Sequence, residues 1–92
     1  MLFLCSFYMR FVYILYSLSR DRYYIGYTID LVARLIKHNA KHKGFTNGVN
    51  DWKIVYSEQF QTKVEATQRE KQIKNWKSRR LIEELTRKNP IG

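Results

Sequence analysis

The chain has 92 residues, enough for one small domain with a single core and too few for a second module. Its net charge is +9, from 17 lysines and arginines against 8 acidic residues, and the cations are spread over both halves. This charge favours a polyanionic partner such as nucleic acid, because cationic side chains that contact phosphates release counterions. A basic protein that is merely kept soluble by its charge would have the same composition.

The first residues and the cysteine content bear on the cellular setting. Cys5 is the single cysteine, so no internal disulfide can form, and no Cys/His pattern of a zinc site is present. We therefore expect a reducing, cytoplasmic setting. Residues 1–8 are apolar but lack the features of a signal peptide, and they are far shorter than the roughly 20 residues that span a membrane. Because Met9 resembles an alternative start, we interpret residues 1–8 as a dispensable extension and 9–92 as one domain, with no membrane partner.

Two strands are predicted next, at residues 11–17 and 23–27. Both segments are rich in β-branched and aromatic residues, and the polar residues between them are typical of a hairpin connection. Tyr13 and Tyr24 then lie on paired strands, either on the same face or diagonally opposed. A buried pair of tyrosines is ordinarily part of a core in which each hydroxyl finds a partner.

A helix is predicted to follow, with Thr28 as its cap and with Leu31 and His38 on one face at i and i+7. Arg34 falls three residues after the leucine and four before the histidine, on neighbouring positions of that face. Arginine binds phosphate oxygens in a planar fork, although a surface arginine is commonly only solvated. His38 and His42 have a spacing that can hold a metal, but no third ligand accompanies them, and a role at the helix end is the simpler interpretation.

The second half is predicted to add one strand and two helices. Residues 44–51 are rich in glycine and asparagine and indicate a loop, and residues 52–60 form the third strand. Thr62 and Glu65 form a capping box that begins the second helix, and Ser78 can cap the third. The order ββαβαα predicts an α+β fold, with helices flanking a three-stranded antiparallel sheet.

Glu70 is the most unusual acidic residue of the second predicted helix. It shares a stripe with Ala66 and Ile73, at i, i+4 and i+7, beside buried positions. A carboxylate there is costly unless it pairs with a cation or binds a metal, and helical geometry leaves both alternatives open. The cations that follow it are candidates for contacts to a phosphate backbone: Lys71, Lys74, Lys77, Arg79 and Arg80.

In their joint order these residues resemble a GIY-YIG endonuclease domain. Such domains carry a tyrosine in the first strand, Tyr-Ile-Gly in the second, an arginine on the next helix and a metal-binding glutamate on a later helix. The matching residues here are Tyr13, then Tyr24, Ile25 and Gly26, then Arg34 and Glu70, with His38 where the family commonly has His or Tyr. The resemblance extends from Met9 onward and is strongest to the small stand-alone branch related to the nuclease domain of excinuclease C.

Two departures from the family pattern stand out. Phe11 and Val12 replace the glycine and isoleucine of the first motif, so only its tyrosine is retained. Relatives also carry an asparagine near the end of the domain, often followed by proline, and Asn89-Pro90 is the matching pair.

The resemblance implies metal-dependent hydrolysis of phosphodiester bonds in nucleic acid, with DNA expected, in repair or processing. It implies that Glu70 holds one Mg²⁺ or Mn²⁺ and that Arg34 neutralises charge on the phosphoryl oxygens. One of Tyr13 and Tyr24 would deprotonate the attacking water while the other orients it, and His38 is a third candidate for handling the proton. Two alternatives stay open: a non-catalytic nucleic-acid-binding module, and a protein-interaction domain that works within a larger repair complex.

Overall fold

A computed structural model describes residues 9–40 and 48–88 of the chain. Its elements, in chain order, are β1 (Arg10–Ser17), β2 (Arg22–Thr28), α2 (Leu31–Asn39), β3 (Trp52–Phe60), α3 (Lys63–Asn75) and α4 (Arg79–Lys88). The predicted order ββαβαα and the predicted α+β class with a three-stranded antiparallel sheet are both confirmed.

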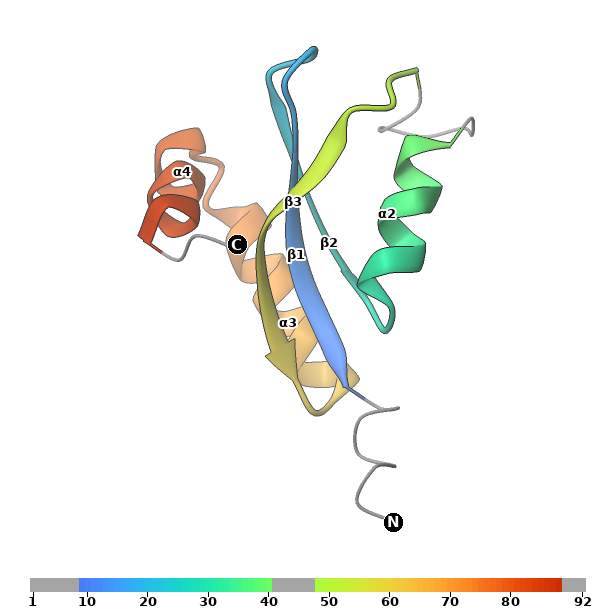
Figure 1. Cartoon of the computed structure of the whole chain (residues 1–92). Helices are drawn as coiled ribbons and strands as arrows, with labels where there is room; N and C mark the ends of the chain where they lie inside the picture. Colours follow the sequence, from blue (N-terminus) through green and yellow to red (C-terminus); the bar gives the residue numbers. More distant parts are fainter. Residues whose placement is uncertain (1–8, 41–47, 89–92) are drawn as a thin grey trace.

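The sheet has the strand order β2-β1-β3, so β1 is the central strand and pairs antiparallel with both neighbours (Figure 1). Successive side chains of a strand point to opposite faces of the sheet. Val12 and Ile14 therefore pack on one face, and Tyr13 and Leu15 pack on the other. All four are at most 1% exposed, so β1 is buried on both sides.

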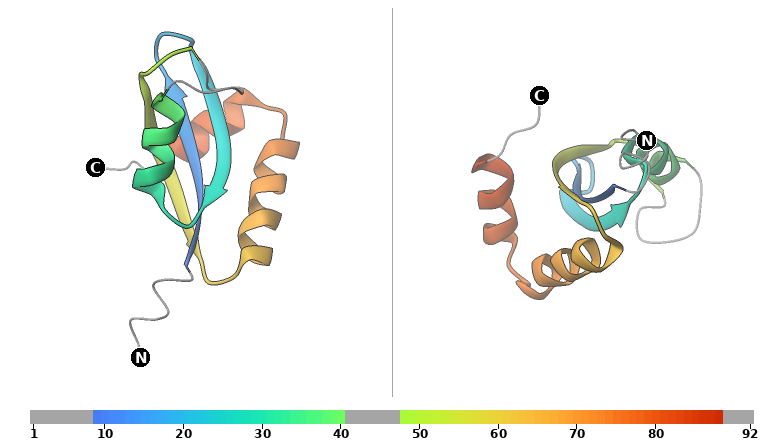
Figure 2. Two further views of the ribbon diagram at one scale, coloured as in Figure 1. Left: turned by 90° about the vertical axis from the view of Figure 1, so that its right-hand side faces the viewer. Right: turned by 90° about the horizontal axis from the view of Figure 1, so that it is seen from below.

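Helices cover both faces of this sheet. Seen from below, the strands lie between α2 and α3, and α4 lies on the same side as α3 (Figure 2). We call the side under α3 and α4 the apolar face, whose buried residues are Val12, Ile14, Ile25, Tyr56, Ala66 and Ile73. We call the side under α2 the tyrosine face, whose buried residues are Tyr13, Leu15 and Trp52, with Tyr24, Leu31 and Leu35 packed against them.

Asp30, and not Thr28, caps the helix α2. The Asp30 carboxylate accepts a hydrogen bond from the Ala33 amide at 3.0 Å, which makes the prediction for Thr28 wrong. Thr28 is still part of β2, where its hydroxyl accepts from the Asp30 amide at 3.2 Å. Because the chain remains extended for two further residues, the first free amides of the helix lie within reach of Asp30 instead.

The other two helices begin as predicted. The Thr62 hydroxyl accepts from the Glu65 amide at 3.2 Å, and the Glu65 carboxylate accepts from the same hydroxyl, also at 3.2 Å. Ahead of α4, the Ser78 hydroxyl accepts from the Leu81 amide at 3.3 Å. These bonds satisfy amides that the first turn of a helix leaves without a partner.

Within residues 9–40 and 48–88, no helix is both long and apolar enough to cross a bilayer. Three expectations from the sequence lie outside the described residues: the extension at residues 1–8, His42, and the pair Asn89-Pro90.

Candidate active site

Two tyrosines and a histidine from three different elements meet on the tyrosine face. The Tyr13 hydroxyl of β1 lies 2.8 Å from Nε2 of His38 on α2. The Tyr24 ring of β2 lies 4.7 Å from the His38 ring and 6.2 Å from the Tyr13 ring, centroid to centroid. Because Tyr13 pairs with Gly26 and Leu15 pairs with Tyr24, the two tyrosines are diagonal neighbours. His38 is only 7% exposed, so its ring faces the sheet, and a role at the helix end does not account for this contact.

Gly26 makes room for this cluster. A Cβ atom at this position would lie 2.7 Å from the Tyr13 hydroxyl oxygen and 3.0 Å from Cε2 of Tyr24. Any side chain would therefore displace both tyrosines, and a glycine is required where another group approaches the strand so closely. Ile25 points the other way and is buried in the apolar face, at 9% exposure. Sheet geometry thus explains the Tyr-Ile-Gly string. Tyr24 and Gly26 lie on the tyrosine face, and Ile25 between them packs into the apolar face.

The electrostatics of Tyr13 bring two further candidates into the cluster. Burial raises the pKa of the Tyr13 hydroxyl well above its usual value, and the neighbouring Tyr24 acts in the same direction. The Arg34 guanidinium lowers this pKa through its charge and a hydrogen bond, whereas the Glu70 carboxylate raises it. Both charged groups therefore act on the same hydroxyl that contacts His38. Of the five predicted site residues, Tyr13, Tyr24 and His38 are in contact, and the charges of Arg34 and Glu70 act on the Tyr13 hydroxyl.

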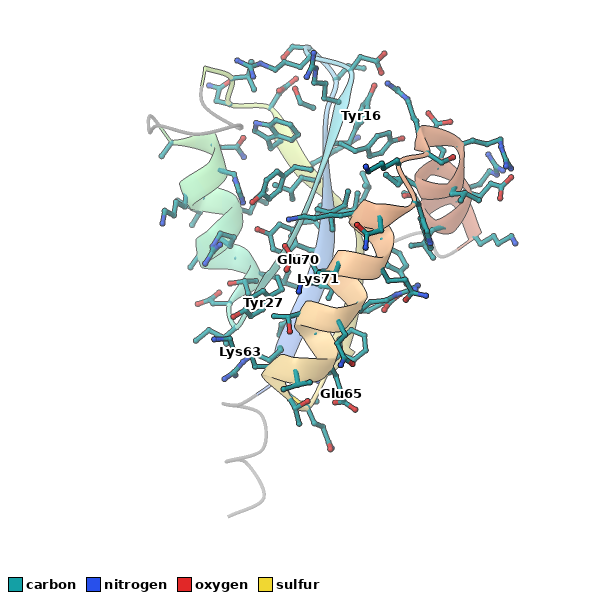
Figure 3. The ribbon with its side chains drawn as sticks, turned by 180° about the vertical axis from the view of Figure 1, so that it is seen from behind. Tyr16, Tyr27, Lys63, Glu65, Glu70 and Lys71 are labelled. Carbon is teal, nitrogen blue, oxygen red and sulfur yellow. The ribbon has the colours of Figure 1, made fainter. Side chains whose placement is uncertain are left out.

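Glu70 reaches this cluster from the opposite side of the sheet. Its helix α3 is held on the apolar face by Ala66 and Ile73, both 0% exposed. Figure 3 shows Glu70 on the flank of α3 that faces β2, with Glu65 at the start of the helix and pointing away from the sheet. Since β2 is an edge strand, the carboxylate can approach the tyrosine face around that edge. Glu70 also forms the ion pair that the sequence left open, with its Oε2 2.7 Å from Nζ of Lys74.

Asn39 anchors the end of α2 that carries His38. Its side-chain amide donates to the Trp52 carbonyl at 2.9 Å, and its side-chain oxygen accepts from the Trp52 amide at 2.8 Å. These two bonds tie the helix to the first residue of β3. This anchor was not predicted from the sequence. An asparagine at a helix end is a recognisable signal, but nothing local identifies a partner on the far side of a loop.

Arg69 fixes α3 to β3 one residue before Glu70. Its guanidinium binds the Glu58 carboxylate through Nε at 3.0 Å and through Nη2 at 2.9 Å, and it lies 5.7 Å from the Trp76 ring centroid. The Tyr56 hydroxyl donates to the same carboxylate. A two-pronged bond of this kind restricts rotation of the helix, and with it the direction of Glu70. This pair, too, was not predicted from the sequence.

The family model of the GIY-YIG catalytic domain matches residues 9–83. The chain belongs to the GIY-YIG family, which is a nuclease superfamily. Proteins named UPF0213 from the Staphylococcus aureus strains Mu3, Mu50 and N315 are each 40% identical to it over an alignment of 82 residues, and the match covers 82% of this chain and 95% of theirs. No solved structure matches the chain significantly.

The departures from the first GIY-YIG motif agree with this geometry. Val12 replaces the isoleucine and is 0% exposed in the apolar face, where one branched aliphatic side chain can stand in for another. Phe11 replaces the glycine and pairs with Thr28, at the far end of β2 from the hairpin. Both changes leave Tyr13 in place. The motif residue that reaches the cluster from β1 is therefore retained.

The cations predicted to contact nucleic acid fall into two groups in this GIY-YIG domain. Three are ion-paired: Lys74 with Glu70, Arg79 with Asp21 and Glu83, and Arg80 with Glu84. Lys71 and Lys77 are exposed and have no ion-pair partner among residues 9–40 and 48–88. These two lysines are therefore the most available of the five for phosphate.

GIY-YIG nucleases generally use divalent metals. In the part of the chain that the structure describes, no group of three or more His, Cys, Asp or Glu side chains could hold a metal ion. Glu70 is the carboxylate that acts on the tyrosine cluster through the Tyr13 hydroxyl. A metal at this cluster would therefore take one protein carboxylate and would fill its other positions from water and substrate.

Proposed function

We propose that this GIY-YIG protein is a divalent-metal-dependent endonuclease of the cytoplasm, which hydrolyses phosphodiester bonds of nucleic acid in repair or processing. DNA is the expected substrate. The observation that carries the proposal is the contact of Tyr13, Tyr24 and His38, from three different elements, around a hydroxyl whose pKa also responds to the charges of Arg34 and Glu70. Together they offer a metal ligand, a phosphate-binding cation and groups that can move a proton.

Glu70 fits a hard divalent cation. Mg²⁺ is commonly bound through one or two carboxylates while it keeps several waters and takes substrate phosphate oxygens, and Mn²⁺ suits the same oxygen ligands. The Glu70 side chain is 17% exposed and its partner Lys74 is 49% exposed, so the lysine can leave the carboxylate without disturbing the core. When bound, such a cation would polarise the phosphoryl oxygen and stabilise the leaving oxygen.

Arg34 is suited to hold the scissile phosphate. Its guanidinium lowers the pKa of the Tyr13 hydroxyl through its charge and a hydrogen bond, against the larger effect of burial. Arginine stays protonated at every relevant pH and offers parallel donors that match two phosphate oxygens. Negative charge on those oxygens increases as the attacking water adds to the phosphorus atom. Loss of one preorganised donor of this kind costs about 3–4 kcal/mol of transition-state stabilisation.

Tyr13 and His38 form a route for the proton of the attacking water. Because burial raises the pKa of Tyr13, its hydroxyl is protonated at neutral pH and can take a proton only while giving up its own. His38 Nε2, 2.8 Å away, is placed to receive that proton in the neutral state of the imidazole. Tyr24 is half-buried at the edge strand, so we assign it to orienting the water. This choice between the two tyrosines is part of the proposal.

A nuclease screen tests the proposal. Single-stranded, duplex and branched substrates of DNA and of RNA are incubated with Mg²⁺, with Mn²⁺ and with EDTA. We expect cleavage with a divalent cation and none with EDTA. Glu70→Gln keeps the shape of the side chain but removes the charge that holds the metal, so cleavage should be abolished while nucleic-acid binding is retained or slightly strengthened.

Glu65→Gln is the matched control on the same helix. It makes the same chemical change at a carboxylate whose hydrogen-bond donor is the hydroxyl of the cap residue Thr62. We expect a loss of about 1 kcal/mol or less in unfolding free energy and unchanged cleavage. If Glu65→Gln abolishes cleavage and Glu70→Gln does not, the metal ligand is wrongly assigned. If the wild type binds nucleic acid but cuts none of the substrates, the binding-module alternative replaces the nuclease.

A further inference from the structure

A pocket of about 380 Å³ lies where the corner between α3 and α4 meets the β1–β2 hairpin. Its polar lining consists of Asp21, Arg22, Lys77, Ser78 and Arg79. Three of these five side chains are cations and one is a carboxylate, so the pocket favours an anion.

Arg79 forms a wall of this pocket. It donates to the Asp21 carbonyl at 2.9 Å and to the Asp21 carboxylate at 2.5 Å, and it lies 5.3 Å from the centroid of the Tyr23 ring. Asp21 and Glu83, whose carboxylate lies 2.9 Å from Nε of Arg79, therefore balance its charge. Lys77 is different, because it is exposed and has no ion-pair partner in the described parts of the chain. Next to it, the Ser78 hydroxyl accepts from the Leu81 amide, which leaves its hydrogen available to a ligand.

The backbone of Lys77 is in a conformation that lysine rarely adopts. Its φ is 47°, in the left-handed region, directly after the end of α3, and its amide donates to the Lys74 carbonyl at 3.3 Å. Glycine or asparagine is the usual residue at this position of a helix end. The conformation itself gives no reason for a lysine here. Lys77 is, however, one of the residues that line the pocket.

We propose that this pocket binds a backbone phosphate of the nucleic-acid strand that flanks the cleavage site, with Lys77 as the charged contact and Ser78 as a second donor. The inference rests on the proposed nuclease function. Lys77 lies two residues beyond Asn75, the last residue of the helix that carries Glu70.

Fluorescence anisotropy of a fluorescein-labelled single-stranded DNA oligonucleotide measures this contact. The full chain carries Glu70→Gln and no divalent metal is added, so cleavage cannot interfere. Lys77→Gln should reduce the slope of log affinity against log salt by about 0.7, which is the contribution of one phosphate contact to a single strand. At about 0.1 M salt this corresponds to about fivefold weaker binding. Lys88→Gln, at the opposite end of α4, removes the same charge and should change neither quantity.

A second variant separates binding from folding. Lys77→Gly relieves the left-handed backbone, so we expect the melting temperature to rise while affinity falls as much as in Lys77→Gln. A lysine with only a structural role would not produce that combination. Equal losses in the Lys77 and Lys88 variants, or no loss in either, would overturn the phosphate site.

The two proposals fail in different ways. A wild-type protein that cleaves DNA, together with a Lys77→Gln variant that binds and cleaves as the wild type does, overturns the pocket alone. A wild-type protein that shows the Lys77-dependent salt slope but cleaves no substrate overturns the nuclease alone. Affinity that is independent of salt overturns both, because the phosphate contacts are then absent.

Discussion

The two faces of the sheet are both covered by helices, yet they are built from different kinds of contact. On the apolar face Val12, Ile14 and Ile73 are 0% exposed and pack against one another without direction. On the tyrosine face the buried Tyr13 hydroxyl is held by the ring nitrogen of His38. Apolar burial is roughly proportional to area and tolerates small shifts, whereas a hydrogen bond fixes distance and angle. The larger buried apolar cluster thus lies on one face and the candidate chemistry on the other.

Helix α3 belongs to both faces. Arg69 binds Glu58 on the apolar side, and the next residue, Glu70, turns toward the edge strand β2. The buried Ala66 and Ile73 set how far the helix lies from the sheet. A change on the apolar face can therefore move the carboxylate as well as weaken the core. Substitutions on each face separate these two effects.

Ile73→Ala should have the largest effect on stability. It removes a fully buried side chain and leaves a cavity under α3, for a loss of about 2–5 kcal/mol in unfolding free energy. Urea unfolding measures the loss. In the folded fraction at low temperature, the tyrosine face should retain its pairing of Tyr13 with His38. A loss below about 1 kcal/mol would contradict the idea that this face carries the stability.

Gly26→Ala should have the next largest effect, because its Cβ would lie 2.7 Å from the Tyr13 hydroxyl oxygen. Relief of such overpacking typically costs about 1–3 kcal/mol. Both tyrosines would be displaced. We therefore expect the cleavage rate of the folded protein to fall as well, beyond what the loss of unfolding free energy alone would cause. Gly48→Ala is the control: its φ of 100° is unfavourable for alanine, but the side chain it would meet is Arg20, away from the cluster. If Gly48→Ala lowers the specific cleavage rate as much as Gly26→Ala, the close approach of Tyr13 to Gly26 has no special role in cleavage.

Tyr13→Phe and Tyr56→Phe make the same deletion on opposite faces. Each removes a hydroxyl with a hydrogen-bond partner, His38 in one case and Glu58 in the other, at a cost of about 1 kcal/mol in unfolding free energy. Only Tyr13→Phe should also reduce cleavage, by about 10²–10⁴-fold, which is the usual contribution of a proton-transfer group. Tyr24→Phe tests the assignment of the base, since a larger loss there than in Tyr13→Phe would exchange the two roles.

Local patterns in the sequence were sufficient for the element order and for much of the core. The alternation in residues 11–17 indicated a strand, and the stripe of Ala66 and Ile73 indicated the buried side of a helix. The cap of α2 was misassigned to Thr28 because that threonine is a good cap residue locally, while strand pairing holds it in β2. That β1 is the central strand depends on pairing with residues from 52 to 60, which no local pattern specifies.

The candidate site also has a part that the sequence predicts and a part that depends on long-range contacts. Tyr13, Tyr24 and Arg34 could be named from motif order, and the structure brings them together. The contacts that hold the site in place were not predictable, because Asn39 with Trp52 and Arg69 with Glu58 join residues on separate elements. Neither pair has a spacing that distinguishes it from other polar residues of the chain. Only the folded arrangement selects the partner.

Alkaline pH should produce a gradual loss of stability. Burial raises the pKa of Tyr13 above its usual value, and burial together with the bond to Glu58 raises the pKa of Tyr56 to about 12. A free tyrosine titrates near about pH 10, so above this pH the unfolded chain loses protons that the folded protein keeps. The stability contributed by these hydroxyls is therefore complete below about pH 10 and is lost as the pH rises through the folded values.

Urea unfolding over this alkaline range, with tyrosinate absorbance followed in parallel, compares the two faces directly. Burial is the largest cause of the higher pKa at both residues, and the pKa of Tyr13 is displaced further than that of Tyr56. Tyr13→Phe should therefore remove more of the pH dependence of stability than Tyr56→Phe, and the double variant should remove more than either. An unchanged slope in Tyr13→Phe would mean that this hydroxyl titrates as freely in the folded protein as in the unfolded chain. In that case the tyrosine face would be open to water, and the relay from Tyr13 to His38 would lose its physical basis.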